Sequence, residues 1–146
     1  MNKITISQVI KSLRENSPGF SLVIDRLVDK YADDEISWDE KVEEYGGIYT
    51  VFNKLAKYLE GLLENNQENE IKKIFGLVEA WHTAGDERVQ EAVTVGLLED
   101  LISLNPDHKL QDEPFFAYMG DETKYWAEQV KGFWRDGTII SDHRNV

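Results

Sequence analysis

Apolar residues recur every three or four positions along most of the chain, and this spacing is the feature that most restricts its fold. It places the apolar side chains on one face of an α-helix, whereas a half-buried strand needs strict alternation. The pattern is continuous from Phe20 to Tyr31 and again from Ile48 to Leu63. We expect helices near residues 5–15, 18–32, 48–64, 70–84, 87–104 and 121–135.

Residues suited to helix ends bound these segments. Ser17, Asp86 and Asp121 are candidate N-terminal caps, and Pro18 fits a first helical turn. Because no stretch alternates as a strand does, and because short turns join neighbouring helices, we predict an all-α fold. The expected architecture is a compact, irregular stack of about six helices, arranged as HEAT-like helical hairpins. In the last helix, Trp126 and the pair Phe133 and Trp134 are expected to close the core.

The whole chain, residues 1–146, is expected to form a single helical domain. A chain of this length buries roughly 70% of the surface that it exposes when unfolded, so it needs no disulfide or metal for stability. Residues 33–47 are expected to be an acidic connecting segment that ends at the two glycines of "GG". The tail, residues 138–146, has no periodic pattern and is expected to be loose.

The connecting segment concentrates negative charge. Between Asp33 and Glu44 seven of twelve residues are carboxylates, with Trp38 and Lys41 among them. Such a run is either a solvated face or a binding patch, and Trp38 is either an anchor into the core or a side chain that faces a partner. Hot spots combine aromatic anchors with charges that fix register. The candidate partner-binding residues are therefore Asp33, Asp34, Glu35, Trp38, Asp39, Glu40, Glu43, Glu44 and Tyr45.

Residues that could carry catalysis or bind a metal form no complete set. Glu79 and His82 in "EAWH" have the three-residue spacing of di-iron bundle ligands, but neither His108 nor His143 follows a glutamate by three positions. The acidic run lacks the alternating ligands of an EF-hand loop, and no Gly-x-Ser-x-Gly elbow, phosphate-binding loop or dinucleotide fingerprint occurs. We therefore predict a protein that is not an enzyme and that has no cofactor and no metal.

The net charge restricts the partners. At a formal charge of -12 and a sequence pI of about 4.6, the chain repels nucleic acid and anionic lipid and attracts basic proteins. Apolar residues in the first segment are spaced, so this segment is neither a signal peptide nor a membrane span. We expect a cytoplasmic protein with no nucleic-acid or membrane partner.

Two segments resemble a known class of proteins. The stretch "GDERVQEAVTVGLLEDL" (Gly85 to Leu101) and the stretch "FFAYMGDETKYWAEQVKGFW" (Phe115 to Trp134) are similar to small helical immunity proteins of bacterial polymorphic-toxin and contact-dependent growth-inhibition systems. Asp86 and Glu99 match positions of that family's pattern. The resemblance implies a one-to-one complex with a cognate toxin domain, expected to be a basic nuclease, whose active site the immunity protein occludes. The alternative is an acidic helical adaptor or scaffold for a basic protein.

Overall fold

The computed structural model describes residues 2–103, 105 and 107–137 of the chain. Within this part the elements are helices, and an isolated backbone bridge joins Ile4 to Gly85. In chain order they are α1 (Ile6–Asn16), α2 (Pro18–Lys30), α3 (Trp38–Glu44), α4 (Gly47–Glu64), α5 (Glu68–Ala84), α6 (Glu87–Glu91), the π-helix η1 (Ala92–Leu98), α7 (Glu99–Leu101), the 3-10 helices η2 (Leu110–Asp112) and η3 (Phe116–Tyr118), and α8 (Asp121–Asp136). The prediction of an all-α fold is confirmed.

Every predicted helix is present, with ends that differ slightly from those expected. The segment expected at residues 87–104 is a continuous run of α6, η1 and α7 that ends at Leu101. The expectation for the tail concerns residues 138–146, which lie outside the described residues.

Helix α3 lies inside the segment that we expected to be only a connection. Ser37 caps it by accepting a hydrogen bond from the amide of Glu40 at 3.2 Å, and Asp39 and Glu40 lie in its first turn, where the helix dipole favours negative charge. Trp38 and Val42 are buried, so the helix also has an apolar face. These contributions offset the repulsion among its carboxylates, which the sequence interpretation weighed too heavily.

The predicted caps are partly confirmed. The side chain of Ser17 accepts from the amide of Phe20 at 3.3 Å, with Pro18 at the start of α2, and Asp86 accepts from the amide of Val89 at 2.9 Å at the start of α6. Asp121 is not the cap of α8, because Gly120 occupies the cap position and has no side chain to accept a hydrogen bond.

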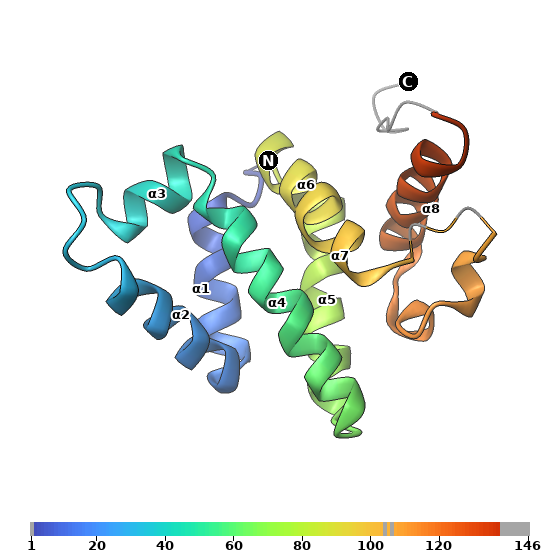
Figure 1. Ribbon diagram of the computed structural model, residues 1–146, viewed down its shortest axis with the longest axis horizontal. Coiled ribbons are helices and arrows are strands. Elements are labelled where there is room, and N and C mark those ends of the chain that lie inside the picture. The colour runs from blue at the N-terminus through green and yellow to red at the C-terminus, as the bar shows by residue number, and fades with distance from the viewer. Residues whose placement is uncertain (1, 104, 106, 138–146) are drawn as a thin grey trace.

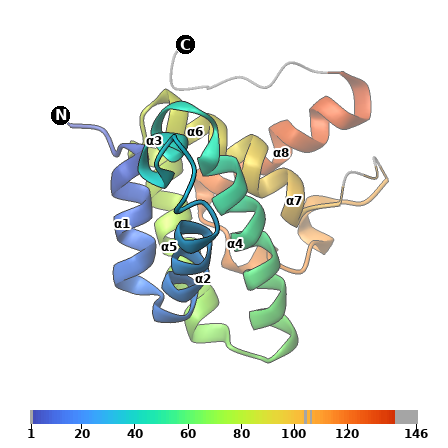
Figure 2. The same cartoon turned by 60° about the vertical axis from the view of Figure 1, so that its left-hand side comes forward.

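The helices are arranged as a stack along the long axis of the molecule. Figure 1 shows α1, α2 and α3 at one end, α4 and α5 in the middle with the run from α6 to α7, and α8 at the other end. Helix α4 packs mainly on η1, and α5 contacts both α1 and α8. Figure 2, a view turned by 60°, shows α5 between α1 and α4 and partly behind α2. Helix α5 therefore forms the centre of the stack.

One continuous core runs through the stack. Its largest fully buried side chains are Trp81 and Phe75 of α5, Phe20 of α2 and Phe52 of α4. In α8, Trp126 joins this core as expected, together with Val130.

The prediction for the end of α8 is wrong. Phe133 and Trp134 are 43% and 47% exposed and lie edge-on to each other. After Val130 the next core-facing position of α8 is Lys131, which is 7% exposed. The helix buries an ion pair there instead of an aromatic pair.

Candidate protein-binding surface

Helix α3 is joined to α4 by an elbow of two glycines. Gly46 has a φ of 77°, a left-handed conformation that glycine adopts without strain, and it caps α4. At Gly47 a Cβ atom would lie 2.9 Å from the amide nitrogen of Val42 and 3.0 Å from the carbonyl carbon of Lys41. The start of α4 is thus packed directly on the backbone of α3, which holds the acidic helix at a fixed angle.

The structure exposes most of the predicted partner-binding residues. The exposed ones are Asp33, Asp34, Glu35, Asp39, Glu40, Glu44 and Tyr45, and Glu43 is half-buried. Tyr45 is 62% exposed, which is high for an aromatic side chain. Lys41 pairs with Asp34 at 2.7 Å, and Arg88 lies 3.9 Å from Glu43. No ion pair among the described residues neutralises the other five carboxylates.

Trp38 is the exception, and the structure decides between its two interpretations. Its side chain is only 7% exposed and stacks on Tyr31, with ring centroids 5.6 Å apart and planes at 11°. The ammonium of Lys41 lies over the other ring of this stack, 4.7 Å from the centroid of Tyr31. Trp38 therefore anchors α3 to α2, and it is not available as a contact for a partner.

A second acidic element, which the sequence analysis did not single out, lies beside α3. Along α6, η1 and α7 the partly or fully exposed residues include Glu87, Glu91, Glu99 and Asp100, with Val95 39% exposed between them. In the sequence, the signal for a shared face is the four-residue spacing of Glu87, Glu91, Val95 and Glu99. The contact between Arg88 and Glu43 joins α6 to α3, so the two acidic elements are neighbours. We call α3 with its preceding loop and this run of carboxylates the acidic surface.

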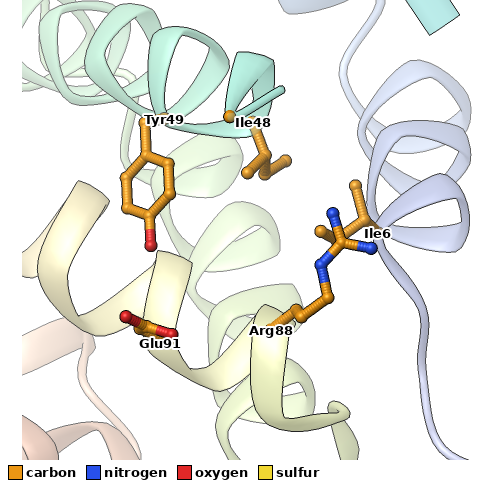
Figure 3. Close-up of a pocket in the computed structure, with 6 residues that line it drawn as sticks. Ile6, Ile48, Tyr49, Arg88 and Glu91 are labelled. Carbon is orange, nitrogen blue, oxygen red and sulfur yellow. The ribbon is translucent and has the colours of Figure 1, made fainter. Parts of the chain in front are cut away.

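A recess opens where these elements meet. It has a cavity volume of about 200 Å³ and is lined by Ile6, Gly46, Ile48, Tyr49, Arg88 and Glu91. Figure 3 shows the hydroxyl end of Tyr49 directed toward α6 on the side of Glu91, while the guanidinium of Arg88 lies beside Ile6. Burial raises the pKa of the Tyr49 phenol, and the charge of Glu91 raises it further against the opposing effect of Arg88. Tyr49 is thus a neutral hydroxyl at physiological pH.

The family model that matches this chain is described as Domain of unknown function (DUF7674), and it covers residues 24–135. The chain belongs to the DUF7674 family. The DUF7674 region begins inside α2 and ends near the end of α8, so it contains α3, the run from α6 to α7 and all of the recess except Ile6. Among curated proteins and among solved structures, none matches the chain.

The "EAWH" motif of the DUF7674 domain has a structural role. The carboxylate of Glu79 in α5 accepts hydrogen bonds from the amides of Glu122 and Thr123, at 3.0 and 2.9 Å, and from the Thr123 hydroxyl at 2.9 Å. It therefore caps α8 from a neighbouring helix. Gly120 is required at this approach, because a Cβ there would lie 2.4 Å from the Glu79 carboxyl carbon.

His82, one turn along α5, continues this hydrogen-bond chain. The residue is fully buried, with its Nδ1 atom 3.0 Å from the Thr123 hydroxyl oxygen and its Nε2 atom 3.4 Å from the hydroxyl of Thr94 in η1. Since Thr123 donates its hydroxyl proton to Glu79, Nδ1 is the donor to Thr123. The chain links α5, α8 and η1. In the part of the DUF7674 domain that the structure describes, no group of three or more His, Asp or Glu side chains is placed to hold a metal ion.

Burial opposes ionisation of Glu79, but the hydrogen bonds outweigh it. The amides of Thr123 and Glu122 and the hydroxyl of Thr123 lower the pKa of Glu79 below its usual value, and His82 contributes in the same direction. A general acid needs the opposite shift. This carboxylate is therefore suited to capping.

A buried ion pair fixes the other side of α8. Lys131 lies 2.9 Å from Glu113, and it donates to the carbonyl oxygens of Ser103 and His108, each at 2.9 Å. The amide of Ser103 donates to the same carboxylate at 2.7 Å. These contacts tie the segment after α7 to α8.

Across the described residues, no helix is both long and apolar enough to cross a membrane.

Proposed function

We propose that this protein is an immunity protein that binds one cognate bacterial toxin domain, a basic nuclease, and neutralises it by covering its active site. The observation that supports the proposal best is the set of five exposed carboxylates around α3 that have no ion-pair partner among the described residues. They lie on or beside a helix fixed by Trp38 and by the Gly46–Gly47 elbow. The resemblance of Gly85–Leu101 and Phe115–Trp134 to immunity proteins supports it independently.

The charge distribution suits a nuclease as the partner. A nuclease presents cations to the phosphates of its substrate, and carboxylates held on a rigid helix are attracted by the same cations. Net charge -12 adds a long-range attraction that accelerates encounter. The carboxylates of α3 would occupy the substrate groove in place of phosphates, so inhibition would be by occlusion. Tyr45, exposed at the end of α3, is positioned to make an aromatic contact at the same interface.

The experiment uses the toxin domain encoded next to the gene for this protein. We expect co-expression to rescue the growth of cells that produce that toxin domain, and light scattering to give a one-to-one complex. The triple substitution Asp39→Lys, Glu40→Lys and Glu44→Lys is expected to weaken the complex by several kcal/mol, because like charges then face the basic groove. Absence of a toxin gene in the neighbourhood, or of any complex with its product, would refute the proposal.

The matched control reverses three carboxylates outside the acidic surface. Glu60→Lys, Glu64→Lys and Glu128→Lys, all at exposed positions, change the net charge by the same amount. The control is expected to slow association modestly and to leave dissociation and growth rescue unchanged. Circular dichroism and melting temperature establish that both variants fold, since lysines in the first turn of α3 cost roughly 0.3–1 kcal/mol each. If both variants weaken the complex equally, the interface is not at α3.

The dependence on ionic strength distinguishes long-range attraction by the net charge from the short-range contacts at the interface. We expect the association rate to fall as ionic strength rises, because the Debye length shrinks to about 8 Å at physiological salt, while dissociation changes less. If the protein binds many basic proteins weakly and none tightly, the result favours the alternative, an acidic adaptor or scaffold.

A further inference from the structure

The recess beside the acidic surface is a preformed cavity. Its volume of about 200 Å³ exceeds the roughly 150 Å³ that accommodates a benzene-sized group in a protein interior. Tyr49 forms one wall and is fixed from behind, since the position of a Cβ on Gly96 of η1 would lie 3.0 Å from its ring. The π-helical turns of η1 begin directly after Glu91, and such turns are frequent at functional sites. A ligand would therefore meet walls that are already ordered.

The lining combines apolar side chains with one phenol, one carboxylate and one guanidinium. Ile6 and Ile48 are 2% and 3% exposed and form an apolar inner wall, while the Tyr49 hydroxyl and the carboxylate of Glu91 lie at the polar wall (Figure 3). Arg88 is the one cation among the lining residues, and it lies 3.9 Å from Glu43, whose charge offsets its own. No ion pair among the described residues involves Glu91. The recess therefore favours a cation with an apolar stem.

We propose that this recess binds a lysine side chain of the basic partner, an inference that rests on the proposed function. The four-methylene stem of lysine would pack against Ile6, Ile48 and the ring of Tyr49, and its ammonium would donate to Glu91 and to the Tyr49 hydroxyl oxygen. A compact ammonium suits one carboxylate and one hydroxyl, whereas the planar fork of arginine is suited to two parallel acceptors. The bound lysine would fix the register of the partner on the acidic surface, as an anchor does at an interface hot spot.

The test uses a small probe in place of the partner. N-acetyl-lysine methylamide is titrated into the labelled full-length protein while backbone amide and isoleucine methyl signals are followed by NMR. The expected result is a saturable shift of signals from Gly46, Ile48 and Glu91, with a dissociation constant in the millimolar range. N-acetyl-norleucine methylamide, which has the same stem without the ammonium, is expected to bind more weakly by roughly tenfold.

Two conservative variants probe the polar wall. Glu91→Gln is expected to weaken lysine binding roughly tenfold, since it removes the charged acceptor, and Tyr49→Phe is expected to weaken it less because the ring remains. Glu60→Gln is the matched control, at an exposed position of α4 outside the acidic surface, and it is expected to change the affinity by about twofold or less. Equal binding of the lysine and norleucine probes, or no effect of Glu91→Gln, would overturn the proposal. So would shifts confined to Asp33–Glu44.

The outcomes distinguish this inference from the function on which it rests. If the toxin domain binds and its affinity depends on Asp39, Glu40 and Glu44 but is the same for Glu91→Gln, the recess proposal fails and the proposed function stands. If the lysine probe saturates the recess while no toxin domain binds, the immunity function fails and the lysine site stands.

Discussion

The substitution Glu79→Gln removes the charge that caps α8 while it preserves the size of the side chain. The carboxylate accepts three hydrogen bonds, from the amides of Glu122 and Thr123 and from the Thr123 hydroxyl, all between 2.9 and 3.0 Å. An amide has one oxygen for these donors, and its NH2 group would face the remaining N–H. Hydrogen bonds to charged groups contribute about 1.5–3 kcal/mol each, and a lost cap costs about 1 kcal/mol. We expect a destabilisation of about 3 kcal/mol.

The assay is thermal unfolding followed by circular dichroism across pH. For a domain of this size about 3 kcal/mol corresponds to a fall in Tm of roughly 6–12 °C at pH 7. The pKa of Glu79 is lower in the folded chain than in the unfolded one, so its contribution is fully present above the unfolded pKa of about 4.3. It is lost as the pH falls through the folded pKa. The Tm difference between wild type and variant is therefore expected to narrow below about pH 4.3.

The control is Glu64→Gln, which removes the same charge at an exposed position of α4. It is expected to change the stability by less than about 0.5 kcal/mol. A Tm for Glu79→Gln within measurement error of the wild-type value, or a difference that does not depend on pH, would show that the carboxylate does not act as the cap.

Two further substitutions test the anchors of the acidic helix and of α8. Trp38→Ala is expected to lower the free energy of unfolding by about 3 kcal/mol in urea titrations, because it removes a buried ring that stacks on Tyr31; unchanged stability would contradict its assignment to the core. Lys131→Met is expected to cost about 3–5 kcal/mol because it removes the ammonium that pairs with the buried carboxylate of Glu113, and the double variant Lys131→Met, Glu113→Gln is expected to recover part of this loss. A double variant less stable than Lys131→Met would contradict that reasoning.

Local signals in the sequence predicted most helices and the caps at Ser17 and Asp86, because these depend on residues only a few positions apart. The same signals misled at α3, where seven residues are too few to show a clear helical period and their charges suggested a connection. At the end of α8, helical spacing placed Phe133 and Trp134 on the expected core face. In the structure α8 is buried only as far as Lys131 and Gly132, and the counter-ion of Lys131 comes from an irregular segment that has no sequence pattern.

The features that depend on distant residues had no signal in the sequence. Glu79 caps a helix that starts more than forty positions later, and the approach that permits it requires Gly120. The recess likewise combines Ile6 with residues from α4 and α6. For the acidic segment, composition predicted the concentration of charge correctly. It left open the position of Trp38, which depends on its stack against Tyr31, directly after the end of α2.

The π-helical segment η1 makes this region sensitive to the deletion of a residue. Its wide turns set the rotation of α7 relative to α6, and with this rotation Asp100 accepts a hydrogen bond from Asn53 of α4 at 2.9 Å while Glu91 stays at the recess. Deleting one residue between Ala92 and Leu98 would turn α7 by about 100° relative to α6, the angle between successive residues of an α-helix. Asp100 would then move away from Asn53, and the row of carboxylates would be divided between two faces. A one-residue deletion in η1 is thus expected to be more disruptive than most substitutions, because the number of residues in η1 determines how α6 and α7 are aligned.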